Sequence, residues 1–455
     1  MISFTGSMPR RRPRVIGLLI AAGIVVAGSY LASAVRPAPV TRTPSTPALP
    51  PARPAQIDGG GVAVGSIKLI DGNIAAWAKN LTSNPSDFLA ATNLATLYQG
   101  RGRLTYDLTD YERALAAART AVAIEPTHAP ARALEAAVLF SLHDFSGAFA
   151  AADALIRDDP SQIGALATRF DAALELGRID DARADLDRLM SAGGPAVTIR
   201  EARLASVTGD APEALERAKA AQGAAIADEV EDVGFYAYAL GEYARLAGDA
   251  GAARVAYTDA LEIRDGDLGA LIGLARIDAF DGRIDDAING LRRATAIAPQ
   301  PESLALLGDL ITTKSRDDPE AAKAFDTLRF IEGLGDVQAV AFDRQLLRFE
   351  LDHGGASEEV LRRAKASVAA RPDWSGHDTV AWALYRLGRF DEAAASIASA
   401  RTLGADDARL RFHEGAIQVA RGDTGGGVGL LRSALELGPA LDPAEHAEAS
   451  RLLGD

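Results

Sequence analysis

The stretch TVAWALYRLGRFDEAAASIASA, residues 379–400, has the pattern of two short helices separated by one glycine. Its first half is apolar at close to the helical period, and Gly388 ends that run. The second half restarts at Asp391, whose carboxylate favours the positive end of a helix. Ala393 and Ala400 are small residues at positions where two antiparallel helices can approach closely. The stretch therefore predicts a helical hairpin.

The same spacing recurs along the chain, which makes this hairpin one copy of a repeat. In several places a glycine is followed by alanines five and twelve residues later and by a proline seventeen residues later. The glycines that carry this frame are Gly177, Gly209, Gly248, Gly282, Gly388 and Gly422, and His143 takes the same place one unit before Gly177. Chance would not keep this phase over so many units, so we expect most of the chain to consist of such hairpins.

A helix–turn–helix period of 34 residues with glycine, alanine and proline in these places resembles the tetratricopeptide repeat (TPR). Whole units carry the resemblance, such as LIGLARIDAFDGRIDDAINGLRRATAIAP (271–299) and RALEAAVLFSLHDFSGAFAAADALIRDDP (132–160). It implies an all-α fold, a right-handed α-solenoid of about nine to ten stacked helix hairpins over residues 73–440. The whole layout is similar to uncharacterised bacterial TPR proteins with an N-terminal membrane segment.

Two regions depart from the repeat pattern. Residues 100–108, GRGRLTYDL, are extra to the first unit and predict an inserted loop. Residues 301–355 keep a helical pattern but lose the register, so the units there are expected to be degenerate.

The C-terminal residues 441–455 predict a capping helix. Asp442 suits the N-cap and Pro443 the first helical position. Stacked repeats need a terminal helix with one polar face, and Ala447, Leu452 and Leu453 are the residues expected on its buried side.

The N-terminal residues 1–35 predict a basic segment followed by a transmembrane or signal helix. Four arginines precede the uncharged, mostly apolar run from Val15 to Val35, which is about 31 Å long as a helix and can cross a bilayer core. The positive-inside bias would place the rest of the chain outside the cytoplasm, as a single-pass protein of a bacterial cell membrane. The alternative is a signal peptide cleaved after Ala34, which would give a secreted or periplasmic protein.

Residues 36–72 are expected to be a proline-rich and glycine-rich linker. Seven prolines fall within residues 36–56, which disfavours helix and favours an extended, semi-rigid chain. The first helix is expected near Asn73.

Charge and composition exclude several classes of function. The 455 residues carry a net charge of −14 and no cysteine, which rules out disulfides and thiolate metal sites. Residues 1–56 contain seven arginines and no acid, so the whole acidic excess belongs to the remainder. An acidic body repels phosphate backbones, and we expect no nucleic-acid binding.

No motif in the sequence predicts catalysis, a cofactor or a metal. The six histidines include no pair three or four residues apart, and HExxH is absent. The glycine clusters at 59–65 and 422–429 lack the GxGxxG spacing and the lysine of a phosphate loop. Paired acids recur just after the turns, where they start the second helix of a unit.

Function is expected in the concave groove that the first helices of stacked units line. In TPR domains, as the resemblance implies, this groove binds peptides of partner proteins. Residues ten, six, three and two places before the turn glycine should face it. The candidates are Tyr238, Glu242, Arg245, Arg276, Phe280, Asp378, Trp382, Tyr385, Arg386 and Phe412. Aromatic residues and arginines are typical interface anchors, although Trp382 and Tyr385 could equally fill the packing between helices.

The resulting hypothesis is a non-enzymatic scaffold, tethered to the membrane, that binds a partner protein or peptide in its groove. A released binding protein is the alternative, and an enzyme that uses the groove as its cleft is a third.

Overall fold

The computed structural model describes residues 62–332 and 336–454, and the side chains of residues 67–332 and 343–454. Within these ranges the chain forms twenty-two α-helices, one short 3-10 helix and no strand. The helix predicted in residues 1–35 lies outside the described residues. In the described part, every helix falls short of the length or the apolar character that crossing a membrane requires.

Ten helical hairpins follow one another in the described part of the chain, after α1 (Val62–Ser83) and before η1 (Gly438–Ala440) and α22 (Pro443–Leu453). The first five pair α2 (Phe88–Thr105) with α3 (Leu108–Ile124), α4 (Ala129–Ser141) with α5 (Phe145–Asp158), α6 (Ile163–Glu175) with α7 (Ile179–Leu189), α8 (Pro195–Val207) with α9 (Ala211–Ala227), and α10 (Val233–Leu246) with α11 (Ala250–Ile263). The other five pair α12 (Leu268–Phe280) with α13 (Ile284–Ile297), α14 (Pro301–Lys314) with α15 (Pro319–Glu332), α16 (Asp336–Asp352) with α17 (Glu358–Ala370), α18 (Trp374–Arg386) with α19 (Phe390–Thr402), and α20 (Ala408–Ala420) with α21 (Thr424–Glu436). The prediction of an all-α solenoid of stacked hairpins is confirmed.

The turn glycines make the hairpins possible. Gly177, Gly248 and Gly388 have φ of 67°, 82° and 75°, the left-handed region that glycine enters without strain. His143, the residue that replaces glycine in the frame, takes the same conformation with φ of 62°. The alanines of the frame are fully buried between helices, as Ala393 in α19 illustrates.

Two expectations about the first helices need correction. Residues 100–108 do not form an inserted loop, because α2 continues to Thr105 and the turn to α3 is made by Tyr106 and Asp107. Gly102 allows this, since an added Cβ there would lie 3.0 Å from the ring of Tyr111 in α3. Helix α1 begins at Val62, inside the segment expected to be a linker.

The C-terminal helix begins where the sequence indicates, with the side chain of Asp442 and that of Glu445 forming a capping box. Leu452 and Leu453 pack against the core of the last units. Ala447 is exposed, however, and Ala449 is buried in its place. The buried face of α22 is therefore rotated from the one predicted.

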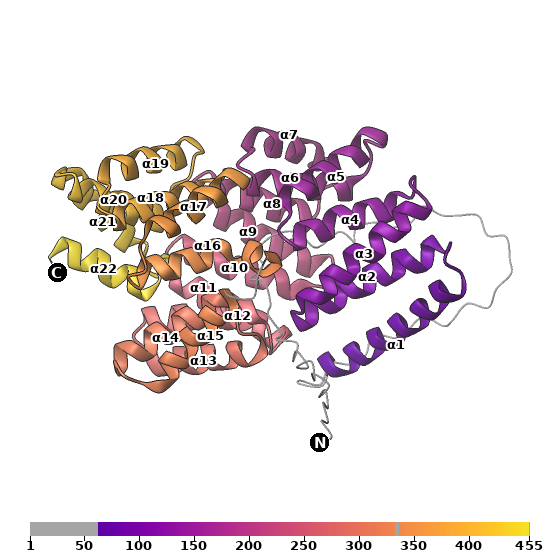
Figure 1. The fold of residues 1–455 in the computed structure, drawn as a ribbon, viewed down its shortest axis with the longest axis horizontal. Helices are drawn as coiled ribbons and strands as arrows, with labels where there is room; N and C mark the ends of the chain where they lie inside the picture. Colours follow the sequence, from indigo (N-terminus) through magenta and orange to yellow (C-terminus); the bar gives the residue numbers. More distant parts are fainter. Residues whose placement is uncertain (1–61, 333–335, 455) are drawn as a thin grey trace, which may run out of the picture.

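The solenoid winds back onto itself, so that its second turn rests on its first (Figure 1). Arg245 of α10 donates hydrogen bonds to the carbonyl oxygens of Pro439 and Ala440, which lie up to 195 residues later, at 3.3 and 3.4 Å. The backbone N–H of Leu268 donates to the hydroxyl of Tyr106 at 3.3 Å. Hydrophobic residues of α3 and α4 also share one core cluster with residues of α14, α15 and α16. The solenoid is consequently closed rather than open.

Glycine contacts inside the hairpins give a matched test of packing. A methyl group at Gly273 in α12 would overlap the buried ring of Tyr257, whereas one at Gly429 in α21 would meet no atom within 4 Å. We expect Gly273→Ala to lower the free energy of unfolding by about 1–3 kcal/mol through overpacking. Gly429→Ala should raise it by up to about 1 kcal/mol, because alanine favours helix over glycine. Urea denaturation followed by circular dichroism would measure both, and equal effects would contradict this packing.

Candidate functional site

The two turns of the superhelix line a partly open cavity of about 990 Å³, called here the central chamber. Its walls come from the first helices of the units, namely α2, α6, α8, α10, α12, α14 and α16, together with the N-terminal ends of α18 and α20. A smaller cavity of about 160 Å³ shares Arg276, Gln345 and Arg348 with it. The chamber is therefore bounded by both turns of the superhelix.

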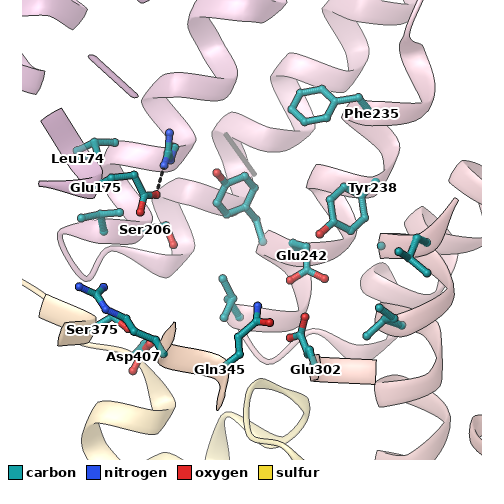
Figure 2. A pocket seen from close by; sticks show the side chains of 18 of the residues that line it. Leu174, Glu175, Ser206, Phe235, Tyr238, Glu242, Glu302, Gln345, Ser375 and Asp407 are labelled. Atoms are coloured by element: carbon teal, nitrogen blue, oxygen red, sulfur yellow. Dashed lines mark hydrogen bonds and ion pairs between the residues drawn. The ribbon is translucent and has the colours of Figure 1, made fainter. Parts of the chain in front are cut away.

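Polar and aromatic side chains face each other across the chamber (Figure 2). Tyr238 and Glu242 project from α10, and Glu302 of α14 and Gln345 of α16 lie opposite them. The carboxylates of Glu242 and Glu302 point toward each other in this view. The chamber is thus lined by both polar and apolar side chains rather than by apolar ones alone.

Ion pairs between successive first helices brace the chamber wall. Arg203 of α8 contacts Asp171 of α6 at 2.9 Å and Glu175 at 2.5 Å. Arg276 of α12 contacts Glu302 of α14 at 2.5 Å. Each pair joins residues about one repeat unit apart, so ion pairs link the first helices of successive units along the chamber wall.

Arg276 also joins the two ends of the superhelical turn. Its Nε lies 2.7 Å from Oδ1 of Asp442, the N-cap of α22. Burial would raise the pKa of Asp442, but Arg276 and Arg409 outweigh it and hold that pKa well below its ordinary value. The carboxylate is therefore ionised in the folded protein, and it fastens α22 to α12.

Glu242 is held as an anion in the chamber wall. The Tyr257 hydroxyl donates to it at 2.5 Å and Arg245 at 3.0 Å. Burial alone would raise the pKa of Glu242, but the charges of Arg245 and Arg276 bring it below its ordinary value. Burial raises the pKa of Tyr238 well above its ordinary value, so its phenol stays neutral. At neutral pH the α10 wall offers one fixed carboxylate beside one neutral phenol.

The repeats of this wall also carry a family signature. Residues 244–310 match the tetratricopeptide repeat model. This segment of the chain therefore contains tetratricopeptide repeats. The matched segment runs from α10 to α14, the helices that supply Arg276 and Glu302.

Several solved structures are similar in fold to this chain. A tetratricopeptide repeat protein from Parabacteroides merdae shares 20% identity with a TM-score of 0.32, over 57% of this chain and 99% of that one. PilW, a type IV pilus biogenesis factor, shares 17% identity with a TM-score of 0.38, over 47% and 98%. Yeast Tom70 shares 11% identity with a TM-score of 0.31, over 79% and 95%. No curated protein sequence matches the chain.

Three of the predicted groove residues of the TPR frame line the chamber, namely Tyr238, Glu242 and Arg276. Arg245 lines the smaller cavity instead, and its guanidinium donates to the backbone before α22. Phe280 is 44% exposed, beside the backbone of Gly438. The residues that the frame selects on α10 and α12 thus lie on the chamber wall, and their role in binding a peptide stays a prediction.

In the last TPR units the predicted groove residues are packed among helices. Trp382 is 1% exposed, its Nε1 donates to Asp352 at 2.8 Å, and its ring stacks on His413. Asp378 and Phe412 are 2% and 1% exposed. Such burial leaves these three side chains almost no surface for a partner. Trp382 therefore fills the packing between helices, which was the alternative to a role in the groove.

Tyr385 and Arg386 belong to the same cluster but are only partly buried. The Tyr385 ring stacks on Trp382 with centroids 4.8 Å apart, and the Arg386 guanidinium lies over the Trp382 ring. Arg386 also makes a two-point contact with Glu448 of α22, at 2.9 and 2.6 Å. The terminal helix therefore already engages Arg386 through Glu448.

Sequence reasoning missed the chamber residues of α14 and α16, among them Glu302, Gln345 and Arg348. They fall in the region where the repeat register is lost, so the glycine frame could not number them. A weaker signal was present, because Gln345, Arg348 and Asp352 form a polar stripe at helical spacing among buried leucines.

In the part of the chain that the structure describes, no three or more side chains come together that could hold a metal ion. The polar groups of the chamber are mostly arginines and carboxylates in mutual contact. Such an arrangement can bind and orient a polar chain by hydrogen bonds and charge.

Substitution of Arg276, whose ion pairs are largely buried, should destabilise the protein strongly. Substitution of Arg292, whose ion pair lies on the surface, should destabilise it only slightly. Arg276→Met would leave Glu302 without an ion-pair partner and Asp442 with Arg409 alone, and we expect it to cost about 3–5 kcal/mol of unfolding free energy. Arg292→Met removes a two-point contact with Glu320 on the surface, and it should cost less than about 1 kcal/mol. Urea denaturation of both variants would test this. Equal losses would show that Arg276 does not fasten the superhelix.

Proposed function

We propose that this TPR protein is a non-enzymatic scaffold whose central chamber holds a segment of a partner protein. The observation that carries the proposal is the chamber itself, a space of about 990 Å³ lined by the first helices of the repeats. Ligand sites in proteins typically have volumes up to about 1,000 Å³ and combine apolar walls with a few placed polar groups. The TPR fold generally serves protein–protein interaction rather than catalysis.

The character of the chamber wall favours an extended peptide as its occupant. Tyr238 and Phe235 provide aromatic surface, which commonly anchors peptides at interfaces. Glu242, Glu302 and Gln345 provide acceptors and a donor for the backbone and side chains of a polar segment. The bound segment would enter between the two turns of the superhelix, which together form the walls.

We further propose that the N-terminal run from Val15 to Val35 anchors the protein in the bacterial cell membrane and leaves the repeats outside the cytoplasm. The support is the length of that apolar run and the arginines before it. The alternative, cleavage after Ala34, would release the same repeats as a secreted or periplasmic binding protein.

Photo-crosslinking tests the chamber as the partner site. With benzoylphenylalanine at Tyr238, in the chamber, we expect capture of a partner protein from native cells. The same probe at Phe330, which is 55% exposed on α15, should not capture it. Ser206→Trp, which fills the chamber, should abolish capture at Tyr238, whereas Ser191→Trp on an exposed turn should not. Capture unaffected by Ser206→Trp would place the partner elsewhere.

The state of the N-terminus separates the anchored protein from the released one. We expect the chain isolated from its native cells to sediment with membranes and to retain the arginines that precede Val15. Edman sequencing or intact mass would show this. A mature chain that starts at Val35 would contradict the anchor and establish the cleaved form.

A further inference from the structure

The part of the chain that the structure describes begins beside the central chamber. Helix α1 starts at Val62, and Ile70, eight residues later, is part of the chamber lining. A helix rises about 1.5 Å per residue, so these two residues lie about 12 Å apart along α1. The residues that directly precede α1 are therefore tethered next to the chamber. A short tether of this kind presents an attached segment at a roughly millimolar effective concentration.

Residues 47–54, PALPPARP, form the most proline-dense stretch before α1, and we call them the proline segment. Four of these eight residues are prolines, which favour the polyproline II conformation. In that conformation eight residues extend about 25 Å, and their backbone N–H and C=O groups have no partners within the segment. The seven residues between the proline segment and Val62 span at most about 25 Å. The segment can therefore reach the chamber without any change in α1.

The chamber wall has the kind of surface that binds polyproline II segments. Phe235 and Tyr238 project from α10 (Figure 2), and Tyr106 lines the same cavity from the turn after α2. All three side chains are half-buried, so part of each remains accessible. Aromatic side chains that line a groove are the usual receptors of such segments. Opposite α10, Oε1 of Gln345 is buried and has no hydrogen-bond partner in the described part of the chain, so it can accept a backbone N–H.

The turn between α9 and α10, residues 228–232, is acidic and largely exposed. Asp228, Glu229 and Glu231 make no ion pair with any other described residue. Glu231 is exposed and also lines the chamber, so the turn lies where the chamber opens to solvent. Glu229 has φ of 49°, a conformation that glycine adopts without strain, so the turn carries this charge at a cost in backbone free energy. The chamber mouth therefore presents negative charge that the described residues leave unbalanced.

We propose that the proline segment occupies the central chamber of its own chain and places Arg53 against the acidic turn 228–232. Residues 36–56 contain three arginines and no acid, so their charge is complementary to that of the turn. Arg53 is the arginine of that stretch nearest to Val62 along the chain. The proposal rests on the proposed function, because it concerns the same chamber and states what a partner must displace from it.

The tether favours the chain's own segment over a second copy of the protein. A second copy binds at its concentration in solution, whereas the attached segment competes at a roughly millimolar effective concentration. Ordering a segment costs conformational entropy, and prolines reduce that cost because their φ is already fixed. The chamber would then open only to a partner that binds more tightly than the tethered segment.

Intramolecular crosslinking tests the occupant directly. In purified full-length protein with benzoylphenylalanine at Tyr238, we expect light to join the probe to residues 47–54, as mass spectrometry of the digest would show. The same probe at the exposed Phe330 should give no such product. In an equal mixture of ¹⁴N- and ¹⁵N-labelled protein, each product should carry a single isotope. A mixed-isotope product would assign the occupant to a second copy, and the absence of any product with residues 47–54 would equally overturn the proposal.

Charge reversal tests the contact with the acidic turn. We expect Arg53→Glu to reduce the crosslink from position 238 at least tenfold, because the turn would then repel the segment. The combined changes Asp228→Lys, Glu229→Lys and Glu231→Lys should reduce it similarly, and joining them to Arg53→Glu should recover most of the yield.

Arg42→Glu is the matched control, because it makes the same change of charge outside the proline segment. It should alter the crosslink yield less than twofold. Equal losses in Arg42→Glu and Arg53→Glu, or no recovery when both sides are reversed, would reject the contact between Arg53 and the turn.

Replacement of residues 36–56 by a glycine-serine linker of equal length separates this inference from the proposed function. We expect the replacement to increase capture of a partner at position 238 at least threefold, because no tethered segment competes. Capture that is lost in Ser206→Trp but unchanged by the linker would keep the chamber as the partner site and reject the tethered occupant. A crosslink to residues 47–54 without capture of any partner, even with the linker, would support the tethered occupant and reject the proposed function.

Discussion

The close approach of two superhelical turns is the constraint on which the rest of this structure depends. At Gly177 an added Cβ would lie 2.5 Å from the carbonyl oxygen of Pro372, and at Gly209 it would lie 2.8 Å from that of Gly404. These glycines therefore meet two demands, a positive φ that reverses the chain and the absence of a side chain where the next turn arrives. Without that approach the first helices would line an open groove, and no chamber would form.

The glycines allow the two turns to approach closely, and ion pairs within the chamber wall then hold the turns together. Arg276 contacts both Glu302 of the next unit and Asp442 at the start of α22, so it joins a local neighbour to a distant one. A buried pair of this kind adds little net stability over apolar packing, but the loss of one partner is costly. The arrangement therefore favours one specific closure of the superhelix over alternatives that would leave a buried charge unmatched.

The local structure could be predicted well because each repeat unit contains its own turn residue and its own small packing residues. Turn residues such as Gly248, with buried alanines at constant distances, define each hairpin without reference to the rest of the chain. The extension of α2 through residues 100–105 was missed, because its two glycines signal a break that packing against Tyr111 overrides. The burial of Trp382 was not decidable either, since the same position in the frame faces the chamber at Glu242. Whether a position of the frame is covered by the other turn of the superhelix depends on contacts between residues nearly two hundred apart in the sequence.

Repeat proteins usually behave as one-dimensional arrays, in which each unit touches only its neighbours and folding can spread from any point. The hydrogen bonds from Arg245 to Pro439 and Ala440 change that behaviour here. As the chain is synthesised from its N-terminus, the first turn must wait for the last twenty or so residues before its surface is complete. Contacts this far apart in sequence raise the entropy cost of folding and slow it, but they also link the two turns of the superhelix. A repeat array linked in this way should unfold more cooperatively than one in which each unit touches only its neighbours.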